Sequence, residues 1–203
     1  MNRIYRRLKK IFGGLLRFIF RVKIVNPEKE ISGTPFIVCA NHTGAFDPVI
    51  ISAAMKNQIC YMAKKEAFKI PIIRHLIKSL GVFPIDRKHG DVGAIKKAIE
   101  ILKDGGCVGI FPQGTRCPYV DPRTTEVKNG IGMIAARAGV GVLPVYLKTK
   151  KNKTGFFKKT RLIIGDYIPP EELDFQLTGK EKYAKISEYV FDKICTLGEE
   201  YEL

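Results

Sequence analysis

The sequence predicts an α/β fold, in which a mainly parallel central sheet is flanked by helices. Short apolar runs rich in strand-forming residues alternate along the chain with segments whose apolar residues recur at helical spacing. Polar groups follow directly after several of these runs, at the strand ends where open α/β sheets bind their ligands. The 203 residues suit one domain with a sizeable core and an appended segment.

The first predicted element is an amphipathic helix over residues 3 to 22. Its charged residues are all basic, and no acidic residue precedes Glu28. A basic helix with a strongly apolar side suits an anionic membrane surface, where it lies among the headgroups without crossing. The alternatives are that the helix packs on the domain with its charges in solvent, or that it binds RNA. No RNA-binding signature is present, so we expect no nucleic-acid partner. The apolar residues at helical spacing are Ile4, Leu8, Ile11, Phe12, Leu15 and Ile19.

Composition narrows the class of protein further. The formal net charge of +15 indicates an anionic partner, and about half of the excess lies in the N-terminal segment. The five cysteines form no C-x-x-C pair, which predicts free thiols in a reducing compartment rather than a disulfide framework or a zinc site. No apolar run reaches the length of a transmembrane helix, and no signal-peptide cleavage site follows the first helix. We therefore expect a peripheral protein on the cytoplasmic face of the cell membrane.

The remaining elements follow from the same two patterns. Residues 36–39 predict a buried strand, and Asp47-Pro48 predict the N-cap and first position of a helix ending near residue 56. Further strands are expected at 58–63, 81–85, 107–111, 142–147 and 161–164. Further helices are expected near 72–79, from Asp91 to Gly105, from Asn129 to Gly139, and over a last segment carrying Tyr183, Ile186, Val190 and Ile194. The basic stretch 148–159 is expected to form an exposed loop or hairpin.

His42 and Asp47 are the candidate catalytic residues. His42 follows the strand at 36–39, and Asp47 lies five residues later at the start of the next helix. A loop that folds back brings the carboxylate onto the imidazole, fixes its tautomer and leaves the other ring nitrogen as a base. The alternative is that His42 is an ordinary surface histidine and that Asp47 only caps the helix.

Two other strand ends carry polar groups, at Asp86-Arg87 and at residues 113–116. If the strands are neighbours, these groups face one crevice together with the histidine. Arginine binds phosphate through a planar fork of donors, although a lone arginine is more often a solvated charge or a salt bridge. No nucleophile elbow or phosphate-binding loop is present, and Cys117 has no adjacent base in the sequence. The pattern therefore indicates a substrate hydroxyl, deprotonated by His42, that attacks a carbonyl.

These residues resemble four sequence blocks of the glycerolipid acyltransferase family. Residues 41–47 resemble its N-H-x-x-x-x-D motif, and residues 81–87 its second block. Residues 111–116 resemble its F-P-E-G-T-R block, and residues 142–145 its fourth. The blocks agree in order and spacing over roughly residues 30 to 165, and within the family the chain most resembles the bacterial 1-acyl-sn-glycerol-3-phosphate acyltransferases.

The resemblance implies a reaction, in which an acyl chain passes from acyl carrier protein or coenzyme A to the sn-2 hydroxyl of lysophosphatidic acid, giving phosphatidic acid. His42 would be the general base and Asp47 would orient it. The thioester is already activated, so no metal and no organic cofactor is expected. Residues 1–25 would form the membrane-associating segment and residues 26–203 the acyltransferase domain. The phosphate and glycerol of the acceptor would be held by Arg87, Gln113, Gly114, Thr115 and Arg116, with Lys64 and Lys128.

Gln113 departs from the family pattern, which has glutamate at this position. Glutamine keeps an acceptor oxygen but loses the charge. We expect activity to be retained, with a changed acceptor preference as one consequence. Two alternatives stay open: an acyltransferase acting on glycerol 3-phosphate or another lysophospholipid, and a non-catalytic lipid- or RNA-binding protein.

Overall fold

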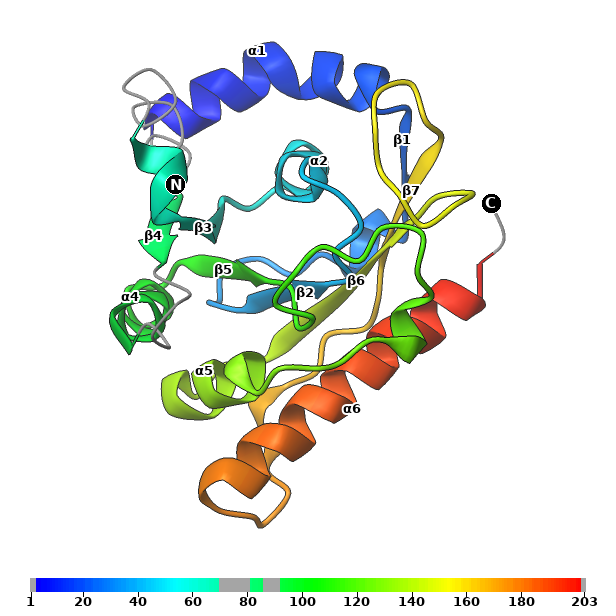
Figure 1. The fold of residues 1–203 in the computed structure, drawn as a ribbon. Helices are drawn as coiled ribbons and strands as arrows, with labels where there is room; N and C mark the ends of the chain where they lie inside the picture. The colour runs from blue at the N-terminus through cyan, green and yellow to red at the C-terminus, as the bar shows by residue number, and fades with distance from the viewer. Residues whose placement is uncertain (1–2, 70–80, 86–91, 202–203) are drawn as a thin grey trace.

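A seven-stranded sheet forms the centre of the molecule (Figure 1). The structure is a computed structural model that describes residues 3–69, 81–85 and 92–201. The strand order is β1-β7-β6-β2-β5-β3-β4, and every neighbouring pair is parallel except β6 and β7. The strands are β1 (Val22–Val25), β2 (Ile37–Ala40), β3 (Ile59–Lys64), β4 (Phe83–Ile85), β5 (Cys107–Ile110), β6 (Val142–Lys148) and β7 (Thr160–Ile164). The predicted mainly parallel sheet flanked by helices is confirmed.

Helices cover both faces of this sheet, as Figure 1 shows. On one face, which we call the α2 face, α2 (Asp47–Ala54) lies against the strands and α1 (Arg3–Ile19) lies over α2. The opposite α6 face carries α4 (Val92–Lys103), α5 (Gly130–Ala138) and α6 (Gly179–Glu199). Strand β2 serves both cores, because Ile37 and Cys39 point to the α6 face while Val38 and Ala40 point to the α2 face. Its continuous apolar run is therefore the signature of a strand buried on both sides.

The first helix is anchored to the domain along one side and exposed along the other. Tyr5 is buried, and its hydroxyl lies 3.3 Å from the carbonyl oxygen of Ser52 in α2. Burial raises the pKa of this phenol to about 12, so it stays a hydrogen-bond donor at neutral pH. The exposed large apolar side chains of α1 are Ile4, Ile11, Phe12, Leu15 and Phe18. The helix thus packs on the domain and also presents an uncovered apolar side.

Several boundaries differ from the predictions. The first helix ends at Ile19 instead of residue 22, and β1 follows it as an unpredicted strand paired with β7. Asp47 is the first residue of α2 and Phe46 its N-cap, so the predicted N-cap was one residue late. The basic stretch joins antiparallel strands, as the predicted loop or hairpin requires, but Lys148 belongs to β6, and Thr149 and Thr154 are buried instead of exposed. The helix expected near 72–79 and the cap at Asp91 lie outside the described residues.

Candidate active site

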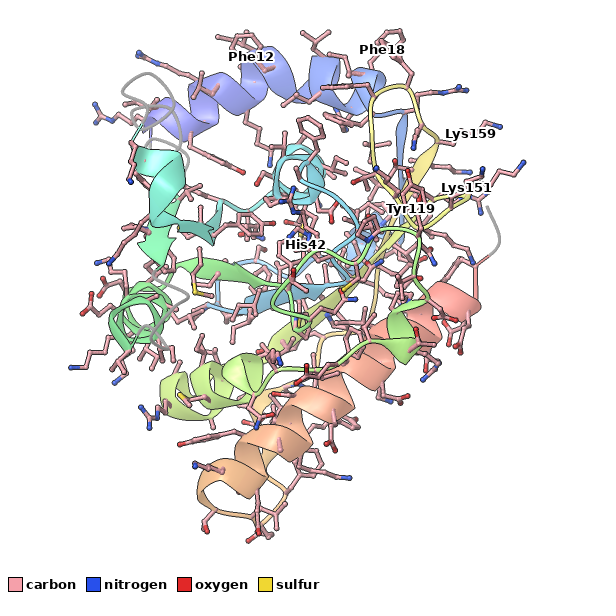
Figure 2. All side chains as sticks on the ribbon, in the orientation of Figure 1. Phe12, Phe18, His42, Tyr119, Lys151 and Lys159 are labelled. Atoms are coloured by element: carbon pink, nitrogen blue, oxygen red, sulfur yellow. The ribbon has the colours of Figure 1, made fainter. Side chains whose placement is uncertain are left out.

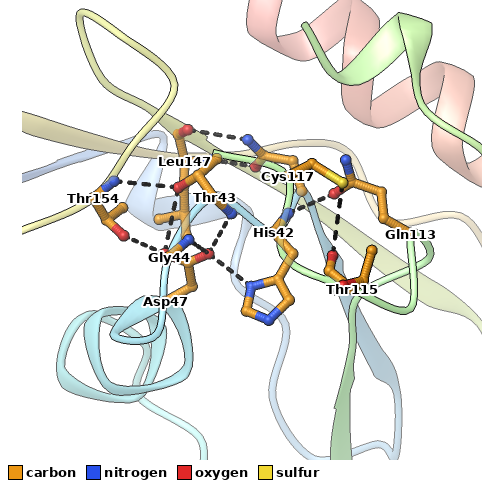
Figure 3. A network of polar contacts seen from close by, with 10 residues as sticks. His42, Thr43, Gly44, Asp47, Gln113, Thr115, Cys117, Leu147 and Thr154 are labelled. Atoms are coloured by element: carbon orange, nitrogen blue, oxygen red, sulfur yellow. Dashed lines mark hydrogen bonds and ion pairs between the residues drawn. The ribbon is translucent and has the colours of Figure 1, made fainter. Parts of the chain in front are cut away.

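A histidine and an aspartate meet in the loop between β2 and α2 (Figure 3). The Nδ1 atom of His42 lies 2.8 Å from the Oδ2 atom of Asp47. The Asp47 side chain is fully buried, and 13% of the His42 side chain is exposed. The loop therefore folds back as expected, and the partly exposed imidazole is the accessible member of the pair.

The Asp47 carboxylate is surrounded by donors. Its Oδ2 atom also accepts hydrogen bonds from the backbone N–H groups of Thr43, at 2.6 Å, and Gly44, at 2.8 Å. Its Oδ1 atom accepts from the hydroxyl of Thr154, at 2.5 Å, and lies 3.4 Å from the hydroxyl oxygen of Thr43. Such donors offset the cost of burying a charge, and the N-terminal position in α2 adds the helix dipole. Because Oδ2 acts as an acceptor, His42 carries its hydrogen on Nδ1 and keeps the lone pair on Nε2.

The plane of the imidazole is fixed by an aromatic ring from the neighbouring strand end. His42 stacks on Phe111, with ring centroids 4.0 Å apart and an interplanar angle of 16°. Tyr61 of β3 lies behind Phe111, with their centroids 6.0 Å apart. Stacking restricts rotation of the imidazole, so Nε2 points in one direction.

The backbone of His42 is clamped by the loop that follows β5. Its N–H group donates to the Oε1 atom of Gln113 over 2.6 Å, and its carbonyl oxygen accepts from the N–H group of Cys117 over 2.8 Å. The Nε2 atom of Gln113 in turn donates to the hydroxyl of Thr125 over 2.9 Å. Gln113 is only 3% exposed, and both ends of its amide are used within the protein. This glutamine therefore holds the backbone of the loop that carries His42.

The other predicted residues fall into three groups. Gly114, Thr115 and Arg116 are exposed beside the Gln113 clamp, and Gly114 has a φ of +66°, which favours glycine. Lys128 is also exposed; its N–H group donates to the carbonyl oxygen of Pro112, and its ammonium group pairs with Glu126.

Arg87 and the side chain of Lys64 lie outside the part of the chain that the structure describes. The strand order places only one of the two other polar strand ends next to β2. β5, which precedes Gln113, adjoins β2, whereas β4, which precedes Arg87, is separated from β2 by β3 and β5.

Three contributors were not predicted. Thr154 comes from the 149–159 loop, and the ring of Phe111 was assigned only to a strand. Asn41 bridges β2 and β6, since its side-chain amide donates to the carbonyl oxygen of Leu147 and accepts from the N–H group of the same residue. Asn41 belongs to the sequence motif and was therefore findable, whereas nothing in the sequence of the basic loop distinguishes Thr154.

Fold and site together define an α/β protein with a histidine–aspartate pair at the carboxyl edge of a mainly parallel sheet. Comparison with known proteins places it more closely. The sequence profile of the family described as Acyltransferase matches residues 21–148, and the chain belongs to this family.

Similar proteins agree with that membership. The chain is 33% identical over 180 residues to a 1-acyl-sn-glycerol-3-phosphate acyltransferase of Bacillus subtilis, covering 87% of each chain. It is 30% identical over 167 residues to the enzyme of the same name from Streptococcus pneumoniae, covering 81% of this chain and 61% of that protein. The crystal structure of the 1-acyl-sn-glycerophosphate (LPA) acyltransferase PlsC from Thermotoga maritima superposes with a TM-score of 0.73. That match has 27% sequence identity and covers 98% of this chain and 80% of the other.

Proposed function

We propose that this protein transfers an acyl chain from an acyl thioester to the sn-2 hydroxyl of 1-acyl-sn-glycerol 3-phosphate, which gives phosphatidic acid. The observation that carries the proposal is the buried Asp47 carboxylate held against the accessible His42 imidazole. The family and the relatives named 1-acyl-sn-glycerol-3-phosphate acyltransferase supply the reaction class and the acceptor.

The geometry suits direct transfer without an acyl-enzyme intermediate. The Nε2 atom of His42 takes the proton of the sn-2 hydroxyl while the oxygen attacks the thioester carbonyl. Asp47 stabilises the imidazolium that forms. When the tetrahedral intermediate collapses, the carbon–sulfur bond breaks and the imidazolium returns its proton to the departing sulfur. The products are the ester and a free thiol, and His42 is neutral again.

We assign the acceptor phosphate to the basic groups near the strand ends. Arg116 and Lys128 are exposed beside the Gln113 clamp, and Arg87 and Lys64 follow from the family resemblance. A guanidinium fork binds phosphate oxygens in pairs, which fixes the glycerol relative to His42. Gly114 and Thr115 lie in the same exposed loop and complete the proposed acceptor site.

We also propose that the α1 helix binds an anionic membrane surface on the cytoplasmic side. Phe12 and Phe18 point away from the domain in Figure 2, and Phe18 is 73% exposed. Basic residues occupy much of the rest of the helix. Among the described helices, none is both long and apolar enough to cross a membrane. An interfacial position would deliver the protein to the layer where its lipid acceptor lies.

The first experiment measures the release of free thiol from two donors, acyl-coenzyme A and acylated acyl carrier protein. Each donor is tested with and without lysophosphatidic acid. Release is expected only when the acceptor is present, and His42→Ala should lower its rate by about 10²- to 10⁴-fold. The donor with the larger kcat/KM is the preferred one. Thiol release without acceptor, or equal release by His42→Ala, would contradict the proposed reaction.

Gln113 is tested separately. Its Oε1 atom already supplies the acceptor that the N–H group of His42 needs, so the protein with glutamine at this position should support turnover. Gln113→Glu keeps that acceptor and adds a buried charge beside the Thr125 hydroxyl. We expect the parent to be active on lysophosphatidic acid and Gln113→Glu to remain within about tenfold of it. An inert parent restored by Gln113→Glu would show that the charge is essential.

A further inference from the structure

The structure assigns to Thr154 the role of a positioning residue for the His42–Asp47 pair, a role that rests on the proposed acyl transfer. Thr154 lies in the 149–159 loop, 107 residues from Asp47 in the sequence. Its side chain is almost entirely buried, and its hydroxyl donates to the carboxylate oxygen that does not contact His42. Figure 3 shows Thr154 on the side of Asp47 opposite the imidazole.

The two carboxylate oxygens of Asp47 are held by different parts of the chain. Oδ2 has its donors within the catalytic loop itself, from the backbone of Thr43 and Gly44 and from His42. Oδ1 has Thr154 at 2.5 Å and the Thr43 hydroxyl only at 3.4 Å. Without the Thr154 hydroxyl, Oδ1 would keep only the long contact, and rotation of the carboxylate would be less restrained. Rotation moves Oδ2 away from Nδ1, so His42 loses its orientation.

The position of Thr154 is itself fixed by several contacts. Its N–H group donates to the hydroxyl of Thr43 over 3.3 Å. Two residues on, Phe156 packs on Phe46, which directly precedes Asp47, with ring centroids 4.7 Å apart. Gly44 also permits the close approach, because a Cβ atom there would lie 2.3 Å from the Thr154 hydroxyl oxygen. The 149–159 loop therefore packs against the His42 loop through both Thr154 and Phe156.

Substitutions of Thr154 test the role directly. Thr154→Val keeps the shape and removes the donor, whereas Thr154→Ser keeps the donor. If the net contribution of a hydrogen bond to a charged group is lost entirely from the transition state, the rate falls by about 10- to 100-fold. We expect Thr154→Val to lower kcat by that factor with KM changed by less than about threefold, because the acceptor site is intact. Thr154→Ser should stay within about fivefold of the parent.

A matched control lies on the same loop. Thr149 is also buried, and its hydroxyl accepts from the N–H group of Lys153 over 2.7 Å instead of donating to Asp47. Thr149→Val disturbs the loop without removing a donor from Asp47, and it should leave kcat near the parent value. The inference is overturned if Thr149→Val costs as much as Thr154→Val, or if Thr154→Ser fails to restore the rate.

A double-mutant cycle with Asp47→Asn separates positioning from folding. If Thr154 acts through the carboxylate, Thr154→Val should cost little further activity in the Asp47→Asn background. Fully multiplicative losses would overturn the role. Thr154→Cys, nearly the same size with only a weak donor, serves the same comparison should the valine variant not fold. If the parent protein transfers no acyl chain, the proposed function is refuted. If the parent is active and depends on His42, but Thr154→Val has the same kcat, only the role of Thr154 is refuted.

Discussion

Two amphipathic helices, α1 and α6, share the same apolar periodicity but differ in how much of their apolar side is buried. α6 buries its apolar side in the core of the α6 face, through residues that include Ile186, Val190 and Ile194. α1 buries only Tyr5 and Gly13 and leaves a row of large apolar side chains exposed. The charges differ too, because all charged residues of α1 are basic, whereas α6 contains both acidic and basic residues. Periodicity thus identifies an amphipathic helix, and the charge on its other side distinguishes α1 from a helix buried in the core.

The same contrast holds for the two faces of the sheet. The α6 face is a closed core whose helices serve stability. The α2 face carries the histidine–aspartate pair at the start of α2 and the exposed helix above it. Substitutions at the histidine–aspartate pair and on the exposed side of α1 should therefore affect function more than stability, whereas substitutions in the core of the α6 face should affect stability more than function. Four predictions test that separation.

The largest effect is expected for His42→Ala on the α2 face. Loss of a positioned base typically lowers the rate by about 10²- to 10⁴-fold. His42 belongs to neither hydrophobic core, but it stacks on Phe111 and pairs with Asp47, so the free energy of unfolding should fall by no more than about 1–3 kcal/mol. Steady-state thiol release and denaturant titration check both halves. A large drop in the midpoint would mean that the imidazole is structural.

The next effect separates the two helices by a pair of identical substitutions. Ile194 of α6 is fully buried, whereas Ile11 of α1 is 66% exposed. Ile194→Ala should lower the free energy of unfolding by about 2–5 kcal/mol, because it leaves a cavity in a packed core. Ile11→Ala should change it by less than about 0.5 kcal/mol. Equal losses, measured by urea unfolding, would show that α1 is as much a part of the core as α6.

A third effect sharpens the role of the exposed side of α1. Phe18→Ser should weaken binding to vesicles of anionic phospholipid by up to about 1.5–3 kcal/mol, the range for full burial of a large apolar side chain. Val92 is exposed on α4 of the opposite face, so Val92→Ser is the matched control and should bind as the parent does. Sedimentation with vesicles measures both. Equal weakening by the two substitutions would place the contact elsewhere.

The smallest effect concerns a single charge. Arg6→Gln on α1 should reduce binding to the same vesicles by about 1 kcal/mol at low salt, and less as salt is added. Lys185, exposed on α6, provides the control, since Lys185→Gln changes the net charge equally on the other face. If both variants lose the same affinity, attraction depends on total charge, and α1 has no special orientation toward the membrane.

The sequence predicted the sheet and the contact between His42 and Asp47 well because both depend on local patterns. Buried runs such as residues 36–39 and the spacing of His42 and Asp47 need no knowledge of distant contacts. Strand β1 was missed because residues 22–25 continue the basic and apolar composition of the preceding helix. The helix and the strand are separated by a backbone turn at Arg21, which has a φ of +44°. Arginine rarely adopts a positive φ, so the sequence did not predict this turn.

The surroundings of the pair were harder to predict because they depend on strand order. Gln113 reaches the backbone of His42 only because β5 adjoins β2, and Thr154 reaches Asp47 only because the loop after β6 folds over α2. Neither neighbour relation follows from spacing along the chain. The sequence therefore predicted the histidine–aspartate contact, and packing supplied the groups that hold it.

The attachment of α1 has one more consequence. The helix is tied at its start through Tyr5 and near its end through Ile19, whose carbonyl oxygen accepts from the N–H group of Phe157 over 2.7 Å. A helix held at both ends cannot swing like a tether. If it lies in a membrane surface, the whole domain is expected to take one tilt, with His42 at a constant height above the lipid headgroups. The distance between the bilayer and His42 would then be set by the way α1 is attached to the domain.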